Sequence, residues 1–289
     1  MKKSIALFVT IAFLFIVIGI LGVVLQTAQK LTSSKNYFIA QDSLLIKSTL
    51  DKLGVMSDEI NTSEQLKQIF TTFPISNDSG TFRAIYTISP LFDRIDINTY
   101  LQNGKINENV DFYINNILDY YQVQDPVFFK DLLLDTLDKD SEEREAYSEI
   151  VLKNPDFQNG KIYNADQLYE IEKYYSDMTE DNNVFKIPWE KLIFFGNGEH
   201  HILECSLLNK KTAKFLGLVF ENEPECNTVF NEENIKTAQN FDIIEYKKNS
   251  DFWINVVIDY FYNDIHNSIS IIYNIYNKKV ISVESHPVY

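Results

Sequence analysis

The sequence predicts an α+β fold in which a long N-terminal helix packs on an antiparallel sheet, with a large inserted α-helical domain. Three observations predict this fold. The chain opens with an apolar run that continues as an apolar stripe, and neither Gly nor Pro occurs between Val23 and Leu53. Strand-like segments occur before residue 100 and again after residue 250. Between them, apolar residues recur at helical spacing.

The first predicted element is a membrane-spanning helix over residues 5–25. These 21 residues include one polar side chain, Thr10, and no charge. At about 1.5 Å per residue they cross the ~30 Å of bilayer hydrocarbon. A secretory signal peptide is the alternative, but its apolar core is shorter, ~7–15 residues, and no small-x-small cleavage site follows Leu25. We therefore expect a retained membrane anchor.

The same helix is expected to continue outside the membrane as far as Leu53 and to end at Gly54. Leu31, Phe38 and Leu45 recur every seven residues, which places them on one apolar stripe. A helix over residues 5–53 would be about 70 Å long. We expect part of this stripe to pack on the protein's own sheet and part to face neighbouring subunits.

The remaining elements follow in order. Residues 81–97 are rich in strand-forming side chains. Helices are expected over residues 111–122, from Pro126 through Leu133, and over residues 165–175. The chain then returns to strands over residues 251–262, 268–276 and 279–284.

The part of the chain beyond the apolar run is acidic. Three of the 26 Lys and Arg residues precede Leu31, so the remainder carries 23 of them against 41 Asp and Glu, a net charge of −18. Such a charge disfavours binding to nucleic acid and to anionic lipid headgroups. Calcium or basic partners fit better.

The two cysteines, Cys205 and Cys226, leave two alternatives open. In an oxidising compartment they would form a disulfide that stabilises the fold by ~3 kcal/mol. Two buried thiols are the equal alternative, because spacing alone does not place the sulfurs within bonding distance.

Several short motifs, taken in order, resemble one known family. Residues 2–8 read Lys-Lys-Ser-Ile-Ala-Leu-Phe, and residues 103–109 read Asn-Gly-Lys-Ile-Asn-Glu-Asn. Residues 133–140 read Leu-Leu-Asp-Thr-Leu-Asp-Lys-Asp and are followed by an acidic stretch, and residues 250–252, Ser-Asp-Phe, precede the last strands. In this order the chain resembles the K-type minor pseudopilin of bacterial type II secretion, the general secretion pathway protein K family.

The resemblance implies a pilin-like fold in five parts. These are a leader over residues 1–4, a transmembrane and spine helix over 5–53, a first α/β part over 54–108, an inserted α-helical domain over 109–234 and a C-terminal β-meander over 235–289. It also implies a single pass through the bacterial inner membrane, with the N-terminus in the cytoplasm and the bulk of the chain in the periplasm.

The function that the resemblance implies is non-enzymatic. Such a subunit lies at the tip of the pseudopilus and helps to initiate its assembly and protein export across the outer membrane. The implied partners are other minor pseudopilins, the major pseudopilin, the prepilin peptidase and secreted substrates. A type IV pilus minor pilin is the alternative within the same class.

The resemblance also implies processing at the N-terminus. Cleavage between Ser4 and Ile5 would make Val9 the fifth residue of the mature helix. Major pilin-like subunits carry a Glu there, which pairs with the terminal amine of the preceding subunit. A carboxylate without a partner in hydrocarbon costs several kcal/mol, so a tip subunit with no predecessor is better served by an apolar residue. The predicted interface residues are Val9, Leu31, Phe38 and Leu45.

An acidic cluster is the predicted cofactor site. Seven carboxylates fall within residues 135–149. Ca²⁺ takes six to eight oxygen ligands, and the resemblance implies calcium in this region. We select Asp138, Asp140 and Glu145 as ligands. A solvated acidic segment without a bound ion is the alternative.

A hypothesis of a different class places a metal at His201 and Cys205. These residues are four apart and would share one face of a helix, as two zinc ligands do. Neither a His-Glu-x-x-His nor a Cys-x-x-Cys motif accompanies them. The protein would then be a bitopic inner-membrane enzyme or sensor.

Overall fold

The computed structural model describes residues 34–78, 82–198, 202–220, 225–247, 252–262 and 265–288. The chain forms two compact units. The first unit holds the described residues up to Ser89 together with those from Lys247 onward, and the second unit spans Pro90–Tyr246. The second unit is therefore inserted into the first, and each unit is described below by itself.

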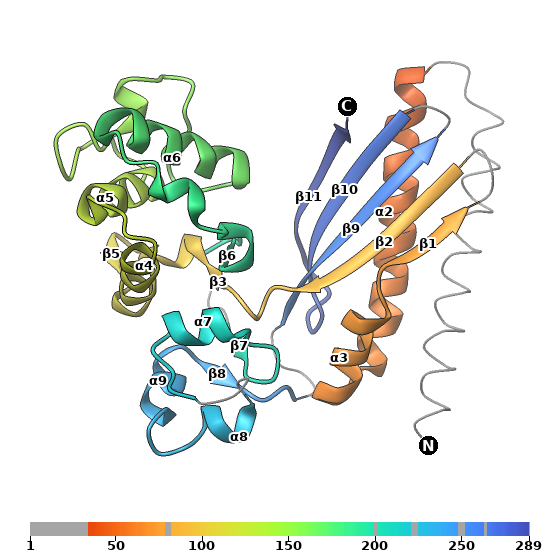
Figure 1. Cartoon of the computed structure of the whole chain (residues 1–289). Coiled ribbons are helices and arrows are strands. Elements are labelled where there is room, and N and C mark those ends of the chain that lie inside the picture. The colour runs from red at the N-terminus through yellow and green to blue at the C-terminus, as the bar shows by residue number, and fades with distance from the viewer. Residues whose placement is uncertain are drawn as a thin grey trace. The chain divides into compact units, whose positions relative to one another are not determined.

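The first unit begins with the long helix α2, Ser34–Glu59 (Figure 1). Its buried positions recur every four residues, at Gln41, Leu45, Thr49, Leu53 and Ser57. This spacing puts them on a single face of the helix. Helix α3, Ser63–Thr72, follows, and the Thr62 side chain caps it by accepting a hydrogen bond from the backbone N–H of Gln65.

The sequence predicts that this helix ends at Gly54, but α2 continues to Glu59. The buried face continues beyond the glycine, because Ser57 is 9% exposed and Ile60 is 3% exposed. Burial of this face outweighs the cost of about 1 kcal/mol that a glycine imposes on a helix interior. The hydroxyl of Ser57 also donates to the Leu53 carbonyl at 2.6 Å.

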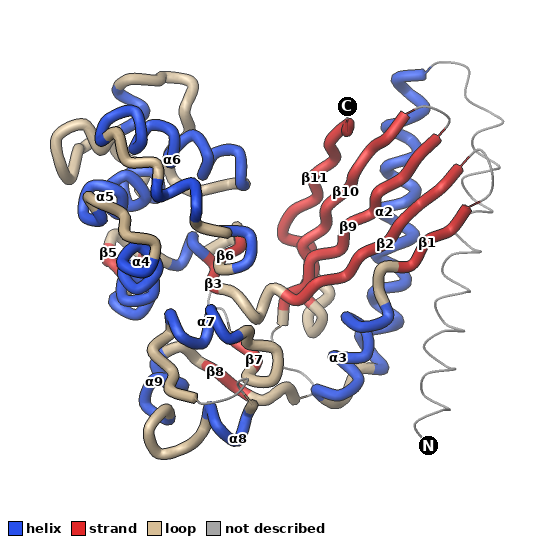
Figure 2. The backbone as a smooth tube through the Cα atoms, viewed as in Figure 1, coloured by secondary structure: helices blue, strands red, loops and turns tan. Residues whose placement is uncertain are grey.

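A five-stranded sheet lies against α2 (Figures 1 and 2). Its order is β1-β2-β9-β10-β11, with β1 at Ile75–Asp78, β2 at Phe82–Pro90, β9 at Trp253–Tyr262, β10 at Ile265–Asn274 and β11 at Val280–Val288. The pairs β1/β2, β9/β10 and β10/β11 are antiparallel. Strands β2 and β9 are neighbours, so the sheet joins segments that lie on either side of the insertion.

Polar contacts fix α2 on this sheet. Asp42 accepts hydrogen bonds from the hydroxyl groups of Tyr260 at 2.5 Å and Ser285 at 2.7 Å, and from the amide of Asn267 at 3.1 Å. These three partners come from β9, β11 and β10. One carboxylate thus links the helix to three strands.

The second unit is mainly helical. Its longer helices are α4, Glu108–Tyr120, α5, Pro126–Leu137, and α6, Ala165–Thr179. Asn107, Asp125 and Asn164 cap their N-termini by accepting backbone N–H groups, as such side chains commonly do. The short helices are α7, Lys210–Phe215, α8, Cys226–Val229, and α9, Ile235–Asn240.

Three two-stranded pairs complete this unit. Strands β4, Leu101–Gln102, and β5, Lys105–Ile106, form a hairpin. Its turn residues Asn103 and Gly104 have φ values of 53° and 73°, the left-handed conformation that Asn-Gly turns favour. Strands β3, Ile95–Asp96, and β6, Ile193–Phe194, are parallel, as are β7, Leu203–Glu204, and β8, Ile243–Ile244.

These pairings explain why the inserted unit is longer than the predicted range of 109–234. Strand β3 precedes that range and pairs with β6 inside it. Strand β8 follows that range and pairs with β7 inside it. Both flanking segments therefore belong to the unit that spans Pro90–Tyr246.

Buried polar groups bring three loops of this unit together. Asp96 accepts hydrogen bonds from the backbone N–H groups of Asn98, Gly196 and Gly198, at 3.0, 2.8 and 3.0 Å. The Asn98 side chain exchanges hydrogen bonds with the backbone of Ile162. A Cβ on Gly196 would lie 2.2 Å from Asp96 Oδ2, so a glycine is required there. Burial raises the pKa of Asp96 to about 6.

Candidate metal centre

The acidic loop, residues 138–160, connects the end of α5 to the segment before α6. Asp135, in the last turn of α5, anchors it. This carboxylate is fully buried and accepts hydrogen bonds from the Arg144 backbone N–H at 3.1 Å, from the Arg144 guanidinium and from the Ser148 hydroxyl. Asp135 therefore has a structural role, and Arg144 holds the acidic loop against α5.

Three buried side-chain oxygens of the acidic loop have no hydrogen-bond partner among the described residues. They are Asp138 Oδ1, Glu149 Oε2 and Asn159 Oδ1. Glu149 is 1% exposed, although it is a carboxylate. A buried oxygen without a partner costs free energy, and a bound cation would remove that cost.

Two of these oxygens belong to side chains that are hydrogen-bonded to each other, Glu149 and Asn159. The Asn159 amide donates to Glu149 Oε1 at 2.6 Å and to the Asp140 carbonyl at 3.3 Å. Asp138 Oδ2 accepts from the Arg144 guanidinium. Carboxylate, side-chain amide and backbone carbonyl oxygens are the donor types that Ca²⁺ takes, so the chemistry of this group fits the predicted ion.

The electrostatics of the loop also favour a cation. Burial raises the pKa of Glu149, and the carboxylates of Asp135 and Asp138 raise it further. Burial also raises the pKa of Asp138, whereas the Arg144 guanidinium acts in the opposite direction. Burial of these negative charges therefore costs free energy, and the single arginine offsets this cost only in part.

The three predicted ligands differ in their burial and hydrogen bonding. Asp138 contributes a buried oxygen, as described above. Asp140 is exposed, and its Oδ1 accepts the Glu142 backbone N–H at 3.0 Å. Glu145 is also exposed, and its backbone N–H donates to Ser148.

The predicted ligand set omitted Glu149 and Asn159. Glu149 is one of the seven carboxylates counted within residues 135–149, but the sequence does not distinguish it from the others. Asn159 is separated from these carboxylates by ten residues, and no spacing rule identifies it.

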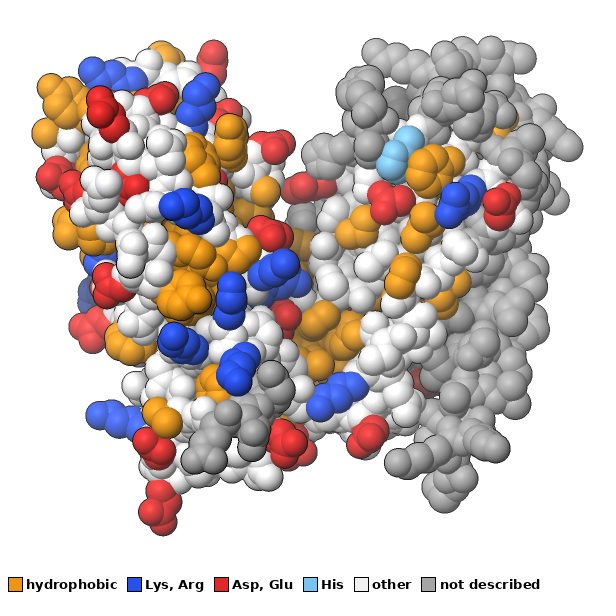
Figure 3. Space-filling model, in the orientation of Figure 1, with side chains coloured by type: hydrophobic (Ala, Val, Ile, Leu, Met, Phe, Trp, Pro, Cys, Tyr) orange, Lys and Arg blue, Asp and Glu red, His pale blue; other side chains and the backbone are white. Residues whose placement is uncertain are grey.

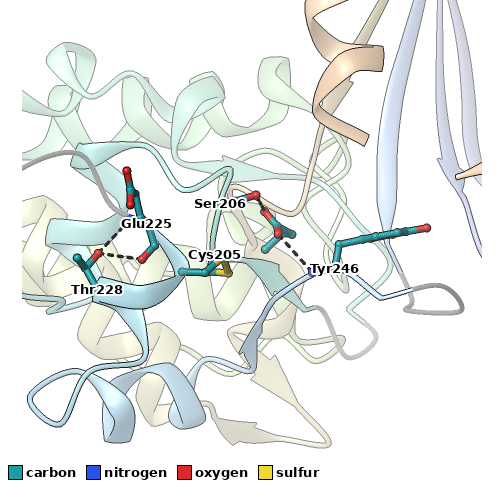
Figure 4. Close-up of a disulfide and its surroundings, with 7 residues drawn as sticks. Cys205, Ser206, Glu225, Thr228 and Tyr246 are labelled. Carbon is teal, nitrogen blue, oxygen red and sulfur yellow. Dashed lines mark hydrogen bonds between the residues drawn. A yellow bond between two sulfur atoms is a disulfide. The ribbon is translucent and has the colours of Figure 1, made fainter. Parts of the chain in front are cut away.

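A second group of ligand-type side chains surrounds the disulfide (Figure 4). Among the described residues, Glu204, Cys205 and Cys226 form the one group of three His, Cys, Asp or Glu whose ligand atoms lie within 4.8 Å of one another. The structure joins Cys205 to Cys226. Glu204 is buried and accepts hydrogen bonds from the Ser206 hydroxyl at 2.5 Å and the Tyr246 backbone N–H at 3.3 Å.

This arrangement does not support a zinc site at His201 and Cys205. The sulfur of Cys205 is committed to the disulfide. The segment before it is strand β7, so no helix face is shared at a spacing of four residues. His201 itself lies outside the described residues.

The predicted interface stripe is described only in part. Ser4, Ile5, Val9 and Leu31 lie outside the described residues, and so does the side chain of Phe38. Leu45 is completely buried, because the four-residue spacing of α2 turns it toward the sheet. Leu45 therefore packs within its own chain and is not available to a neighbouring subunit. No helix among the described residues is long and apolar enough to cross a membrane.

Comparison with known proteins gives a match by structure. No family model and no curated protein matches the sequence. The structure is similar to a chain in the crystal structure of the GspK-GspI-GspJ complex from the type 2 secretion system of enterotoxigenic Escherichia coli. The two chains share 10% sequence identity with a TM-score of 0.59, and the match covers 87% of this chain and 98% of that chain. The mixed fold of helices and antiparallel sheet confirms the predicted resemblance: by its fold, this chain is similar to a GspK-type pseudopilin.

Proposed function

We propose that this chain is a minor pseudopilin at the tip of a type II secretion pseudopilus, where it helps to initiate pseudopilus assembly and protein export. The fold similarity over nearly the whole chain is the observation that carries the proposal. The match covers 98% of the other chain and 87% of this chain, so it includes the helical unit inserted between β2 and β9. This inserted unit therefore supports the proposal as well. The proposed role is non-enzymatic.

The proposal includes the location and the partners. Residues 5–25 anchor the chain in the bacterial inner membrane with the bulk of the chain in the periplasm, as their length and apolar composition suggest. The partners are other minor pseudopilins and the major pseudopilin. The matched structure contains GspI and GspJ beside GspK, which supports partners of this kind.

A groove in the first unit is a suitable place for a neighbouring helix. It has a volume of about 580 Å³ and lies between α2 and the edge strand β11. Ile46, Leu50 and Val283 contribute apolar surface, and Lys47 and Asp51 are exposed beside them. Val283 is 41% exposed, so a partner would bury more of it.

The proposed cofactor is calcium, bound in the acidic loop. Asp138, Glu149 and Asn159 supply the buried oxygens described above. An ion bound there would fix the loop by contacting oxygens that otherwise lack partners.

Cysteine crosslinking in secreting cells tests the proposal. A Lys47→Cys variant places a free thiol beside the groove, since the native cysteines are joined to each other. We expect adducts with small pseudopilins. A Glu170→Cys variant, exposed on α6 outside the groove, serves as the control and should not form these adducts. Absence of adducts at Lys47→Cys, in cells that export normally, would contradict a role in the tip complex.

A further inference from the structure

Helix α7 carries an unusual concentration of positive charge for this protein. The chain has a net charge of −15, yet Lys210, Lys211 and Lys214 fall within five residues and are all exposed. Lys214 is separated from the other two by four and three residues, which places all three on adjacent positions of the helix surface. Among the described residues, none of the three forms an ion pair with a carboxylate.

Tyrosine rings at the end of α4 hold two of these lysines. The Lys214 ammonium lies 5.0 Å from the centre of the Tyr120 ring, and the Lys211 ammonium lies 6.0 Å from the centre of the Tyr121 ring. Lys211 Nζ also donates to the Tyr121 hydroxyl at 3.4 Å. Cation–π contacts orient the ammonium groups without neutralising their charge. Both lysines thus remain free to attract an anion.

The surface beneath these side chains is held in place by contacts between α4 and α7. The ring of Tyr120 packs edge-on against Phe215, with 5.4 Å between the ring centres. The Asn116 side chain donates to the Phe215 carbonyl at 2.8 Å, which ties α4 to α7. Gly217 has a φ of 83° and allows the ring of Phe112 to approach its backbone closely. A preformed surface loses little entropy when it binds a partner.

Aromatic side chains extend the lysine cluster into a mixed surface. Tyr120 is 50% exposed and Phe112 is 49% exposed. In Figure 3, Lys and Arg side chains surround a hydrophobic area in the region that Figure 1 labels α4 and α7. Interfaces in proteins are enriched in aromatic side chains, with charged groups at the rim.

We propose that this basic-aromatic surface, formed by Lys210, Lys211, Lys214, Tyr120 and Phe112, docks a short acidic peptide segment of a partner protein. Charge complementarity selects acidic side chains, and the exposed rings accept an apolar or aromatic residue beside them. The segment is short because α7 extends only about 9 Å, at 1.5 Å for each of its six residues.

The overall charge of the chain selects a peptide over larger polyanions. A nucleic acid or an anionic membrane would extend beyond three lysines and be repelled by the net negative charge of the chain. A peptide of a few residues contacts the cluster alone. The inference does not depend on the proposed role in secretion, because it rests on the second unit only.

The test uses the detergent-solubilised full chain and the fluorescent peptide Glu-Asp-Phe-Glu-Asp-Tyr. We expect measurable binding that weakens as salt is raised from 0.1 to 1 M, since the screening length falls from ~10 to ~3 Å. The double variant Lys211→Glu and Lys214→Glu should bind at least tenfold more weakly. The double variant Lys211→Arg and Lys214→Arg should retain binding, because it keeps the positive charge. Equal melting temperatures of the Glu variant and the unmodified chain would show that the loss does not come from unfolding.

A matched control separates the surface from the net charge. Lys153→Glu and Lys173→Glu change the charge of the chain by the same amount at exposed positions outside this cluster, and Lys153 also lies over a tyrosine ring. This variant should bind the peptide as well as the unmodified chain. An equal loss in both Glu variants would overturn the proposal, as would equal binding of a Gln-Asn-Phe-Gln-Asn-Tyr peptide.

Two further outcomes would assign the surface to another occupant. Tighter binding to anionic phospholipid vesicles or to single-stranded DNA than to the acidic peptide would overturn the choice of a peptide. Glu221 and Glu223 lie outside the described residues. A tenfold gain in peptide affinity after Glu221→Gln and Glu223→Gln would show that the chain's own acidic segment is the occupant, and would overturn a partner protein.

Discussion

At the scale of single residues, this protein keeps several carboxyl groups in its interior. Glu172 is an example, since it is 7% exposed and accepts a hydrogen bond from the Trp189 indole at 2.8 Å. Burial raises the pKa of Glu172 to about 7, and Glu190 contributes in the same direction. The folded state therefore binds a proton more tightly than the unfolded state does.

The first prediction concerns the pH dependence of stability. Because the folded pKa of Glu172 is raised from 4.5, its protonated form stabilises the fold below about pH 4.5, and this contribution is lost as pH rises through about 7. Replacing Glu172 by Gln keeps an oxygen for the indole and removes the charge. We expect the variant to exceed the parent in unfolding free energy by about 2 kcal/mol at pH 8, and to match it near pH 4.

Urea unfolding at both pH values measures this difference. Burial also raises the pKa of Asp96, to about 6. Asp96 is present in both proteins, so its contribution to the unfolding free energy cancels in the comparison. A variant that is less stable than the parent at pH 8 would contradict the account of Glu172.

The second prediction concerns the acidic loop. A ligand that binds only the folded state stabilises it by RT ln(1+[L]/Kd), about 2.7 kcal/mol at one hundred times Kd. Millimolar Ca²⁺ should therefore raise the melting temperature, and the double variant Asp138→Asn and Glu149→Gln should abolish the gain. Asp140→Asn should have a smaller effect, because Asp140 is exposed and already hydrogen-bonded to the backbone.

Glu142→Gln is the control, since Glu142 is exposed in the same loop. Thermal melts in Ca²⁺ and in chelator test whether calcium binds in this loop. The same melting temperature in both solutions would exclude calcium from the loop.

At the scale of elements, the disulfide holds the second half of the inserted unit together. It joins Cys205, next to β7, to Cys226, at the start of α8, across a separation of 21 residues. The helices between and after these residues are only four to six residues long, so they rely on tertiary contacts more than on their own hydrogen bonds.

The third prediction is that Cys205→Ser with Cys226→Ser lowers the unfolding free energy by about 3 kcal/mol, the entropy of closing a loop of this length. Reductant should lower the stability of the parent by a similar amount and leave the variant unchanged. If reductant destabilises both proteins equally, loss of the disulfide is not the cause of the lower stability.

At the scale of the whole molecule, the proposed role in a pseudopilus implies processing of the N-terminus. The fourth prediction is that a prepilin-type peptidase cleaves between Ser4 and Ile5, where a small residue follows two lysines and precedes an apolar run. Intact-mass measurement of the membrane-extracted protein checks this. A mature chain that begins at Met1 would remove processing from the proposal, but it would leave the fold similarity unchanged.

The sequence by itself determined several of the longer helices and strands in the described part of the chain. Helical and alternating patterns predicted α4, α5, α6 and the last three strands, because these patterns follow from which side of each element is buried. Motif order predicted the resemblance that the fold similarity confirms. The acidic run located the region of the candidate metal centre, since clustered carboxylates are visible in composition.

Only the tertiary structure decided the pairings between distant residues. The sequence left the cysteines open, because a bond across 21 residues depends on how the intervening helices pack. The sequence predicted an end of α2 at Gly54, because the tertiary contacts that bury Ser57 and Ile60 are not visible in the sequence. From the sequence we selected Asp140 and Glu145 as ligands rather than Glu149 and Asn159. Composition shows where carboxylates occur, whereas burial and hydrogen bonding decide which oxygens lack a partner.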